Sequence, residues 1–355
     1  MTKTRVALIG CGRVARVHAA ALTSLDETEL VAVVDIKPDR AEAFSERYGA
    51  KAYTDYKDVL NLPEVDAVQL ATPHHTHAQI TIDALKAGKH VLTEKPMAIT
   101  VPDMEAMIKT AEESNRTLGV IFQNRYNDAS QAVKQAIDSG QLGAIKGTRA
   151  VITWRRTDEY YTQSDWKGTW DKEGGGVLID QAIHTIDLMQ WLVGEVDWLE
   201  ARYDTRAHDI IDVDDVAEAH IVFENGAIGC LYASCNYSYD APVFLEVHGE
   251  KGIAHIIGDT ATITIGSKTV TVEQEPDEAN GLRYWGFSHK RQIKDFYRAV
   301  QAGKQPFIDG RAGKVAVDMV LAMYESSRRQ TPIYFPYVPG APSCSKSRGG
   351  CCSCE

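Results

Sequence analysis

The sequence predicts an α/β protein with an N-terminal doubly wound parallel sheet and a C-terminal α/β domain that has a large, mostly antiparallel open sheet. Over the first ~120 residues, short apolar runs alternate with segments of helical periodicity, which is typical of a parallel sheet with helices on both faces. From residue 124 the expected strands are longer and follow one another through turns. We therefore expect one domain over residues 1–123 and a second over residues 124–337.

Each expected strand of the first domain is a buried apolar run that ends in a loop. The strands should cover residues 5–10, 30–35, 65–72, 90–95 and 117–123. The helices between them should cover residues 13–24, 37–49, 77–88 and 101–114, where the apolar positions change to helical spacing. Because ligands of doubly wound sheets bind beyond the carboxyl ends of the strands, the loops at these ends are the first candidates for function.

The first of these loops is the turn "GCGRVA", residues 10–15. Its first glycine allows a tight turn, its second lets the backbone approach a pyrophosphate, and Ala15 is small enough for the helix to pack on the strand. The new helix then directs its N-terminal N–H groups at the phosphates. The cofactor contacts expected in this turn are Gly10, Gly12, Arg13 and Val14.

Asp35 ends the second strand, near the spacing expected of a carboxylate that binds ribose hydroxyls. Together with the glycine turn, this residue predicts a dinucleotide-binding Rossmann domain over residues 1–123. A 2′-phosphate would be repelled by the carboxylate, so we expect NAD rather than NADP as the cofactor. Lys37 lies two residues further on and would soften the repulsion.

Two later loops should also face the cofactor. The loop "ATPHHTH", residues 71–77, offers Thr72, Pro73, His74 and His77, and the loop "TEKPMA", residues 93–98, offers Glu94 and Lys95. The histidines of the first loop have no acidic partner nearby in the sequence, so we expect no metal there. Lys95 should emerge at a strand end beside the nicotinamide, and the following proline fixes the turn. The alternative is an ordinary solvated lysine.

The second domain is expected to contain strands within residues 146–156, 215–238, 243–258 and 260–273. Asn225-Gly226 lies between two alternating segments and is a strong hairpin signal. An antiparallel sheet can leave one face uncovered. The sequence offers no other large cover, so we expect a second subunit there, in a homodimer or homotetramer. Amphipathic helices over residues 288–303 and 312–329 should close this domain.

The stretch "GGGVLIDQAIHTIDL", residues 174–188, places three titratable groups in an apolar helix. At about 100° per residue, Asp180, His184 and Asp187 fall within about 60° on one helix face. A solvated face would carry Lys or Glu, and neither occurs between residues 174 and 193. The three groups therefore either satisfy one another in a buried network or face a ligand. The preceding glycines favour the ligand, because they let a backbone approach closely.

A bound dinucleotide, a lysine at a strand end and an Asp/His pair fit the oxidation of an alcohol by hydride transfer. A histidine with a pKa near neutrality suits the base that removes the hydroxyl proton. A lysine ammonium near the same oxygen stabilises the developing alkoxide. A carboxylate can hold the histidine or a neighbouring hydroxyl in place.

With these elements in order, the chain resembles the glucose–fructose oxidoreductase and inositol dehydrogenase family (Gfo/Idh/MocA) through about residue 336. The resemblance rests on "GCGRVA", "EKP" and "GGGVLIDQAIHTIDL". It implies an NAD(P)-dependent dehydrogenase of a sugar, cyclitol or related polyol. It also implies that Lys95 lies near the reacting hydroxyl, that Asp180 and His184 are the site aspartate and the general base, and that Gln123 approaches the nicotinamide or substrate. Ala182 departs from the family, in which glycine is common between the two.

The residues that bind the substrate are less clearly marked. Residues 151–170 are rich in aromatic side chains, which suit the C–H faces of a sugar ring but equally suit a core or a subunit contact. The candidates are Gln123, Arg125, Trp154, Arg155, Trp166 and Tyr284. Two other functions are open: a glycosidase that uses NAD in a closed redox cycle, and a non-catalytic NAD-binding regulator.

The composition excludes other classes of protein. The chain has 38 Lys+Arg against 49 Asp+Glu, a net charge of −11, which argues against nucleic acid as the main partner. No apolar run approaches the ~18 residues of a membrane span, and the first residues do not resemble a signal peptide, so we expect a cytoplasmic protein. Residues 338–355 hold Cys344, Cys351, Cys352 and Cys354, and such a cluster is also the kind that binds a soft metal. The spacing matches no zinc pattern, so we expect a disordered, dispensable tail there instead.

Overall fold

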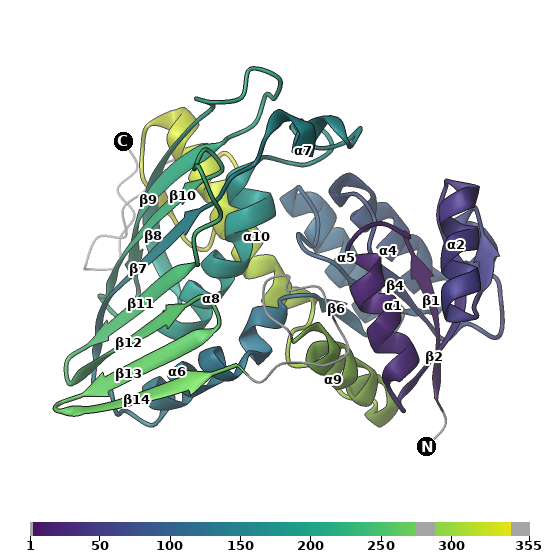
Figure 1. Ribbon diagram of the computed structural model, residues 1–355, viewed down its shortest axis with the longest axis horizontal. Coiled ribbons are helices and arrows are strands. Elements are labelled where there is room, and N and C mark those ends of the chain that lie inside the picture. The colour runs from purple at the N-terminus through teal and green to yellow at the C-terminus, as the bar shows by residue number, and fades with distance from the viewer. Residues whose placement is uncertain (1–2, 275–287, 342–355) are drawn as a thin grey trace. The chain divides into compact units, whose positions relative to one another are not determined.

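The computed structural model describes residues 3–274 and 288–341, which form two compact units (Figure 1). Residues 3–127 and 288–314 make the first unit, and residues 128–274 and 315–341 make the second. The first unit thus contains a late segment of the chain that the sequence places in the second domain. The candidate residue Tyr284 and the four tail cysteines lie outside the described residues.

The first unit contains a six-stranded parallel sheet in the order β3-β2-β1-β4-β5-β6. Its strands are β1 (Thr4–Ile9), β2 (Thr28–Val34), β3 (Lys51–Tyr53), β4 (Ala67–Leu70), β5 (His90–Thr93) and β6 (Leu118–Val120). This is the strand order of a Rossmann fold, in which ligands bind where the order reverses, between β1 and β4. The five predicted strands are confirmed, and β3 is an addition that was too short to show a period in the sequence.

Helices cover both faces of this sheet (Figure 1). One face carries α1 (Ala15–Ser24), α2 (Pro38–Tyr48) and α9 (His289–Ala302), and the other carries α4 (His77–Lys86) and α5 (Val101–Glu113). Shorter helices are α3 (Tyr56–Leu60) and the 3₁₀ turns η1 (His74–Thr76) and η2 (Gln123–Tyr126). Because α9 was expected to close the second domain, its place in the first unit corrects the sequence prediction. Its residues Ile293, Phe296 and Tyr297 pack into the core with α1.

The second unit contains a nine-stranded sheet in the order β14-β13-β12-β11-β7-β10-β9-β8-β15. Its strands are β7 (Ile145–Thr153), β8 (Val196–Asp204), β9 (Val216–Phe223), β10 (Ile228–Ser234), β11 (Phe244–Gly249), β12 (Gly252–Ile257), β13 (Thr260–Ile265), β14 (Lys268–Glu273) and β15 (Ile333–Tyr334). All neighbours are antiparallel except β7 and β10. The predicted open, mostly antiparallel sheet is confirmed, and β8 and β15 are strands that were not predicted.

One face of the larger sheet carries α6 (Asp128–Asp138) and α8 (Ile183–Val193), as Figure 1 shows. On the opposite face alternate residues of β10, namely Ile228, Cys230 and Tyr232, are exposed. The unit also contains α7 (Asp158–Thr162) and most of α10 (Gly310–Arg329). Residues Val177–Ala182, which the sequence predicted as the start of one α-helix, form a π-helix that leads into α8.

The last described residues of the chain are hydrogen-bonded to α10. The backbone N–H of Gly340 donates to the carboxylate of Glu325 at 3.1 Å, and the hydroxyl of Tyr337 donates to it at 2.9 Å. Residues 338–341 are therefore bound to the second unit, in contrast to the expectation of a free tail from residue 338. None of the helices in the described part of the chain is both long and apolar enough to cross a lipid bilayer.

Candidate active site

The turn between β1 and α1 contains two glycines. Contacts within the protein leave no room for a side chain at Gly10, whereas they leave room for one at Gly12. Gly10 has a φ of 95°, and a Cβ there would overlap the carbonyl oxygen of Ala71. A Cβ on Gly12 would meet no described atom within 4 Å. The space beside Gly12 is therefore open to a ligand, as the close approach of a pyrophosphate requires.

Asp35 follows β2 and lies beside this turn. Its Oδ2 accepts the backbone N–H of Cys11 at 2.9 Å, and its Oδ1 accepts that of Lys37 at 2.9 Å. A carboxylate has about four acceptor positions, so two remain for the hydroxyls of a ribose. A hollow of about 330 Å³ adjoins the turn, lined by Cys11, Gly12, Arg13, Arg16, Arg40, Ala43 and Phe44. These residues fit a dinucleotide at the switch point of the sheet.

The loop after β4 is joined to the loop after β5 by His77. This side chain is fully buried, with Nδ1 2.8 Å from the carbonyl oxygen of Pro96 and Nε2 2.9 Å from that of Thr72. Burial lowers the pKa of His77, although the two carbonyls act in the opposite direction. Both ring nitrogens thus contact the backbone of the loops, and His74, also buried, lies one helical turn before it. The sequence did not predict that His77 joins two loops.

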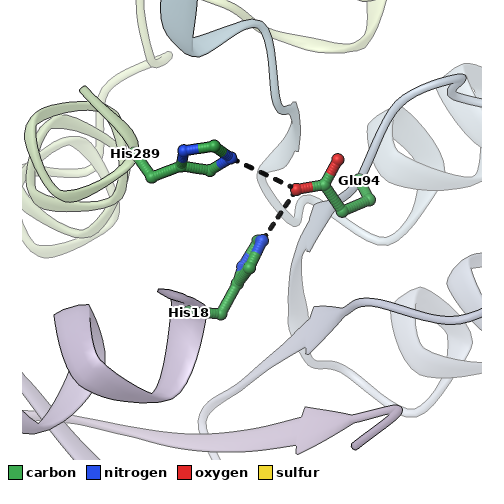
Figure 2. A group of neighbouring side chains, drawn as sticks. All are labelled: His18, Glu94 and His289. Atoms are coloured by element: carbon green, nitrogen blue, oxygen red, sulfur yellow. Dashed lines mark hydrogen bonds and ion pairs between the residues drawn. The ribbon is translucent and has the colours of Figure 1, made fainter. Parts of the chain in front are cut away.

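The loop after β5 begins with a buried Glu94 and a half-buried Lys95. Figure 2 shows that the Glu94 carboxylate lies between the imidazoles of His18 and His289. Oε1 of Glu94 is 2.7 Å from Nε2 of His18 and 3.7 Å from Nε2 of His289. Nothing in the sequence groups these two histidines with "EKP", because both lie far from it in the chain, on α1 and α9.

The end of β6 is held by Gln292, a residue that was not a candidate from the sequence. Gln292 of α9 accepts the backbone N–H of Phe122 at 3.0 Å and donates to the carbonyl of Val120 at 2.7 Å. The candidates Gln123 and Arg125 follow in η2 and are both buried. α9 therefore fixes the backbone that carries these two side chains.

In the second unit, two of the glycines before the π-helix pack closely against other residues of the protein. A Cβ on Gly176 would overlap the carbonyl oxygen of Asp214, and a Cβ on Gly175 would overlap the hydroxyl of Tyr324. The buried Asp214 carboxylate accepts N–H groups of Gly176 at 2.6 Å and Leu178 at 2.9 Å. It also accepts the hydroxyl of Tyr324 at 2.8 Å. The close approach expected of a ligand is thus made by Asp214 and Tyr324 instead.

Asp180 lies in the π-helix and is bound by three neighbouring side chains. Its Oδ2 accepts Nζ of Lys167 at 2.6 Å, the hydroxyl of Tyr160 at 2.7 Å and the amide of Gln181 at 2.9 Å. Lys167 also lies over the rings of Tyr160 and Trp166, at 4.6 and 4.5 Å from their centroids. Asp180 is therefore the centre of a charged cluster with a lysine that the sequence did not single out.

Glu173 is the second carboxylate of this cluster. Nζ of Lys167 is 3.3 Å from its Oε1, and the backbone N–H of Gly168 donates to its Oε2 at 2.5 Å. Burial and the nearby Asp180 raise the pKa of Glu173 to about 7, against the opposing effect of Lys167. The pKa of Lys167 is raised, because Asp180, Tyr160 and Glu173 outweigh the effect of burial. The cluster therefore gains or loses a proton at Glu173 near neutral pH.

His184 lies on the first turn of α8, two residues after the π-helix ends. Its side chain is 8% exposed and that of Asp187 is 1% exposed, which agrees with the prediction that this stretch is not a solvated face. The prediction of a single α-helix through Asp180 is wrong, because a π-helix has wider turns than the assumed geometry. π-Helical turns occur frequently at functional sites.

The aromatic segment before the glycines divides into packed and more open residues. Trp154 is buried and donates its indole N–H to the carbonyl of Ala241 at 3.2 Å. Arg155, a substrate candidate, is exposed, whereas the next residue, Arg156, forms an ion pair with Asp240 at 3.1 Å. Trp166 is half-buried next to Lys167. Of the aromatic candidates described, Trp166 thus lies nearest to the charged cluster.

Comparison with known proteins covers both units. Residues 4–122 match the family description "Oxidoreductase family, NAD-binding Rossmann fold", and residues 130–255 match the "GFO/IDH/MocA C-terminal domain". The chain belongs to the Gfo/Idh/MocA oxidoreductase family. This confirms the resemblance seen in the sequence, the assignment to an oxidoreductase, and NAD as the cofactor of the Rossmann domain.

Several relatives span nearly the whole chain. Myo-inositol 2-dehydrogenase of Thermotoga maritima is 29% identical over 95% of this chain and 100% of its own length. D-glucoside 3-dehydrogenase of Escherichia coli is 28% identical over 93% of this chain and 97% of its own. Among solved structures, the WlbA dehydrogenase of Bordetella pertussis, in complex with NADH and UDP-GlcNAcA, has a TM-score of 0.84 at 30% identity, covering 95% of this chain and 100% of its own. Levoglucosan dehydrogenase, in complex with NADH and levoglucosan, has a TM-score of 0.87 at 25% identity over the same shares.

Proposed function

We propose that this Gfo/Idh/MocA protein oxidises a secondary hydroxyl of a sugar, inositol or related polyol by hydride transfer to NAD, with His184 as the base and Lys95 assisting. The observation that carries the proposal is the arrangement around Asp180. In a chain with an NAD-binding domain, Lys167 and Tyr160 fix this carboxylate immediately before the helix that bears His184. A carboxylate that is fixed in this way can orient a neighbouring hydroxyl or imidazole.

NAD bound to the first unit would accept the hydride in this reaction, and the residues of the chain handle the proton and the charge. We assign the contacts with the pyrophosphate and ribose to the glycine turn and Asp35, whose open acceptor positions support this role. Nε2 or Nδ1 of His184 takes the hydroxyl proton. The ammonium of Lys95 stabilises the negative charge that develops on the same oxygen. Asp180 holds the substrate hydroxyl or His184 in orientation, and Lys167 holds Asp180 through an ion pair at 2.6 Å.

The substrate class follows from the relatives and the composition of the site. Relatives that match nearly the whole chain are named dehydrogenases of inositol, glucosides and levoglucosan. The half-buried Trp166 lies beside Lys167, so an aromatic ring and hydrogen-bonding groups, the combination that suits a sugar, are next to one another. A structure bound to UDP-GlcNAcA is 30% identical, so a nucleotide sugar belongs among the compounds to be tested.

The experiment is a panel of substrates with NAD, followed by NADH absorbance. It should contain myo-inositol, glucose, galactose, their acids, methyl glucosides, levoglucosan and UDP-GlcNAcA. NADH formed in proportion to substrate with one of these supports the proposal. Release of a sugar from a glycoside without net NADH would instead indicate the closed redox cycle of an NAD-dependent glycosidase. NAD binding without turnover of any compound in the panel would count against the proposal.

The assignment of the base is tested by His184→Ala. We expect kcat to fall by roughly 10²–10⁴-fold, the usual contribution of a positioned acid–base group. NAD affinity, measured by calorimetry, should stay within about 2-fold, because cofactor binding is assigned to other residues. The matched control is His90→Ala, at the amino end of β5, away from the ligand end of the sheet. A folded His184→Ala variant with wild-type kcat would refute the assignment.

We also propose that the exposed face of the nine-stranded sheet is a contact between copies of this chain, in a homodimer or homotetramer. Three neighbouring strand pairs place Tyr232, Val151, Phe244 and Ile257 in one row across β10, β7, β11 and β12. Tyr232 and Ile257 are 36% and 52% exposed. An apolar row of this kind on an open sheet is typical of an interface rather than of a solvated surface. We place the enzyme in the cytoplasm, where NAD is available, and cell fractionation tests that location.

A further inference from the structure

Glu94 precedes Lys95 in the chain, and its carboxylate lies between the imidazoles of His18 and His289 (Figure 2). Oε1 is 2.7 Å from Nε2 of His18 on α1 and 3.7 Å from Nε2 of His289 on α9. Oε2 accepts the backbone N–H of Lys95 at 3.1 Å. A single carboxylate therefore connects the position of Lys95 to the helical layer of the first unit.

The ring of His18 is itself fixed from the other side. Its Nδ1 contacts the amide nitrogen of Gln69, on β4. The carbonyl oxygen of that amide accepts the hydroxyl of Tyr297, on α9, at 2.9 Å. His18, Gln69 and Tyr297 are all fully buried. With an amide N–H at Nδ1, the proton of a neutral His18 is on Nε2, which then donates to Glu94.

Charge strengthens these contacts. Burial alone would raise the pKa of Glu94, but the hydrogen bond with His18 and the nearby imidazole of His289 lower it well below its ordinary value. Glu94 is therefore an ionised carboxylate inside the protein. A hydrogen bond from a backbone N–H to an ionised acceptor is roughly twice as strong as one to a neutral acceptor.

The backbone on the other side of Lys95 is held in a comparable way. Nδ1 of the buried His77 is 2.8 Å from the carbonyl oxygen of Pro96, and its Nε2 is 2.9 Å from the carbonyl oxygen of Thr72. Lys95 thus lies between two backbone groups that buried side chains bind. Its own side chain is only half-buried, so its direction depends on how firmly the backbone is fixed.

We propose that His18 and Glu94 are positioning residues for Lys95: His18 orients the Glu94 carboxylate, and this carboxylate fixes the backbone N–H of Lys95. The inference rests on the proposed function, in which Lys95 stabilises the developing alkoxide. It adds a residue on α1, 77 positions away in the chain, to the determinants of that step. It also gives Glu94 a role that is separate from cofactor binding.

The same three residues could be read as a metal site, since their ligand atoms lie within 4.8 Å of one another. The distances argue against this. Two ligands of a tetrahedral zinc ion, each about 2.0–2.1 Å from the metal, are about 3.3 Å apart. His18 and Glu94 are 2.7 Å apart, which is the length of a charge-assisted hydrogen bond. A hydrogen-bonded cluster therefore explains the geometry without a metal.

The test is a double-mutant cycle on the full-length protein, with kcat measured on the panel compound that gives the highest turnover. We expect His18→Ala to lower kcat by about 10- to 100-fold, because a misplaced reacting group loses about that much. In a Lys95→Ala background the same substitution should change kcat by less than about 2-fold, since the group that it positions is gone. His18→Gln retains an N–H donor toward Glu94 and should recover part of the rate. If His18→Ala does not fold, His18→Asn, which has the shorter amide, takes its place in the cycle.

Hydrogen exchange provides a readout that needs neither substrate nor cofactor. The amide of Lys95 should exchange at least about 10-fold faster in His18→Ala than in the wild type, because its acceptor is no longer held, and His18→Gln should restore protection. Wild-type kcat in Lys95→Ala would refute the proposed function itself. The positioning role alone would be refuted by a different outcome. In that outcome Lys95→Ala lowers kcat, and His18→Ala lowers kcat by the same factor in the wild-type and in the Lys95→Ala backgrounds. Stoichiometric zinc that is lost in His18→Ala would also overturn it.

Discussion

Lys167 determines the charge of the cluster around Asp180. It is the cation between two carboxylates, Asp180 at 2.6 Å and Glu173 at 3.3 Å, and all three side chains are at most 14% exposed. One cation balances one of two carboxylates, and burying the second charge is costly. The raised pKa of Glu173 follows from this imbalance, because a neutral Glu173 leaves one ion pair in the cluster.

The first prediction concerns the pH dependence of stability. The pKa of Glu173 is about 7 in the folded protein, above its ordinary value, so between about pH 4.5 and 7 the folded state holds a proton that the unfolded state has released. The stabilisation from this group is present in full below that range and is lost as pH rises through 7. Glu173→Gln has no carboxyl group to titrate at this position, so it should not lose this stabilisation. The decrease in unfolding free energy from pH 5 to pH 8 should therefore be smaller in the variant than in the wild type, by up to about 3 kcal/mol.

Urea unfolding of both proteins at pH 5 and pH 8 measures this effect. The exposed Glu105→Gln on α5 is the control and should leave the pH dependence of the wild type unchanged. If Glu173→Gln and the wild type lose the same free energy between the two pH values, Glu173 does not titrate in this range.

The second prediction concerns cofactor choice at Asp35. Its carboxylate would repel a 2′-phosphate, whereas Arg16 and Arg40 line the adjoining hollow and would attract one. The preference is measured as kcat/KM with NAD divided by kcat/KM with NADP. Asp35→Ser should lower this ratio by about 10-fold or more. Asp39→Ser, an exposed position in the first turn of α2, should not change the ratio. Tighter binding of NADP than of NAD to the wild type, measured by calorimetry, would contradict the assignment of Asp35.

At the scale of the elements, the loop that contains Gly12 and the loop that contains Gly176 have glycine for different physical reasons. A side chain at Gly176 would overlap the Asp214 backbone, whereas a side chain at Gly12 would enter open space. From the sequence alone, both glycines are interpreted as positions where the backbone lies close to another group, which is either a ligand or a part of the protein. Only the structure separates the glycine that packing requires from the one that leaves room for a ligand.

The third prediction uses these glycines as a matched pair. Gly176→Ala should lower the unfolding free energy by about 2 kcal/mol or more, because the Cβ meets backbone atoms that cannot move away independently. Gly12→Ala should leave the melting temperature within a degree or two of the wild type while NAD affinity falls by about 10-fold or more. Thermal unfolding and calorimetry with NAD measure both. An equally destabilised Gly12→Ala would mean that this glycine, too, is structural.

The order of elements in the Rossmann half was predictable because each strand is a short apolar run followed by a loop with recognisable chemistry. The π-helix at residues 177–182 was not predictable, since the same apolar residues fit an α-helix and the sequence does not record the width of a turn. Lys167 was missed for a related reason. It lies in a loop, without the periodicity or motif that drew attention to Asp180 and His184.

At the scale of the whole chain, the sequence predicted one boundary between domains, whereas the described residues pass between the units more than once. The amphipathic pattern of α9 shows which of its faces is buried, but it does not show that Phe296 and Tyr297 pack beside α1. That long-range contact is also what brings His289 and Tyr297 to the cluster around Glu94. The parts that His18, His289 and Tyr297 play around Glu94 could therefore not be found from local sequence.

The last prediction concerns the assembly through the open sheet. Its ninth strand, β15, has only two residues. The eight strands β7 to β14, each six to nine residues long and about 4.8 Å apart, give a face about 34 Å wide and about 20 to 30 Å long. That area reaches the ~800 Å² per partner of a standard interface.

Tyr232 lies in the apolar row at the middle of this face, so Tyr232→Glu would bury a charge against a partner sheet. Light scattering coupled to size exclusion should show a dimer or tetramer for the wild type and a smaller species for Tyr232→Glu, with the same circular dichroism. The control Lys304→Glu changes an exposed residue after α9, in the other unit, and should keep the wild-type mass. A monomeric wild type at micromolar concentration would show that the open face is not a contact between copies. A Tyr232→Glu variant of unchanged mass would show instead that the chain assembles through a different surface.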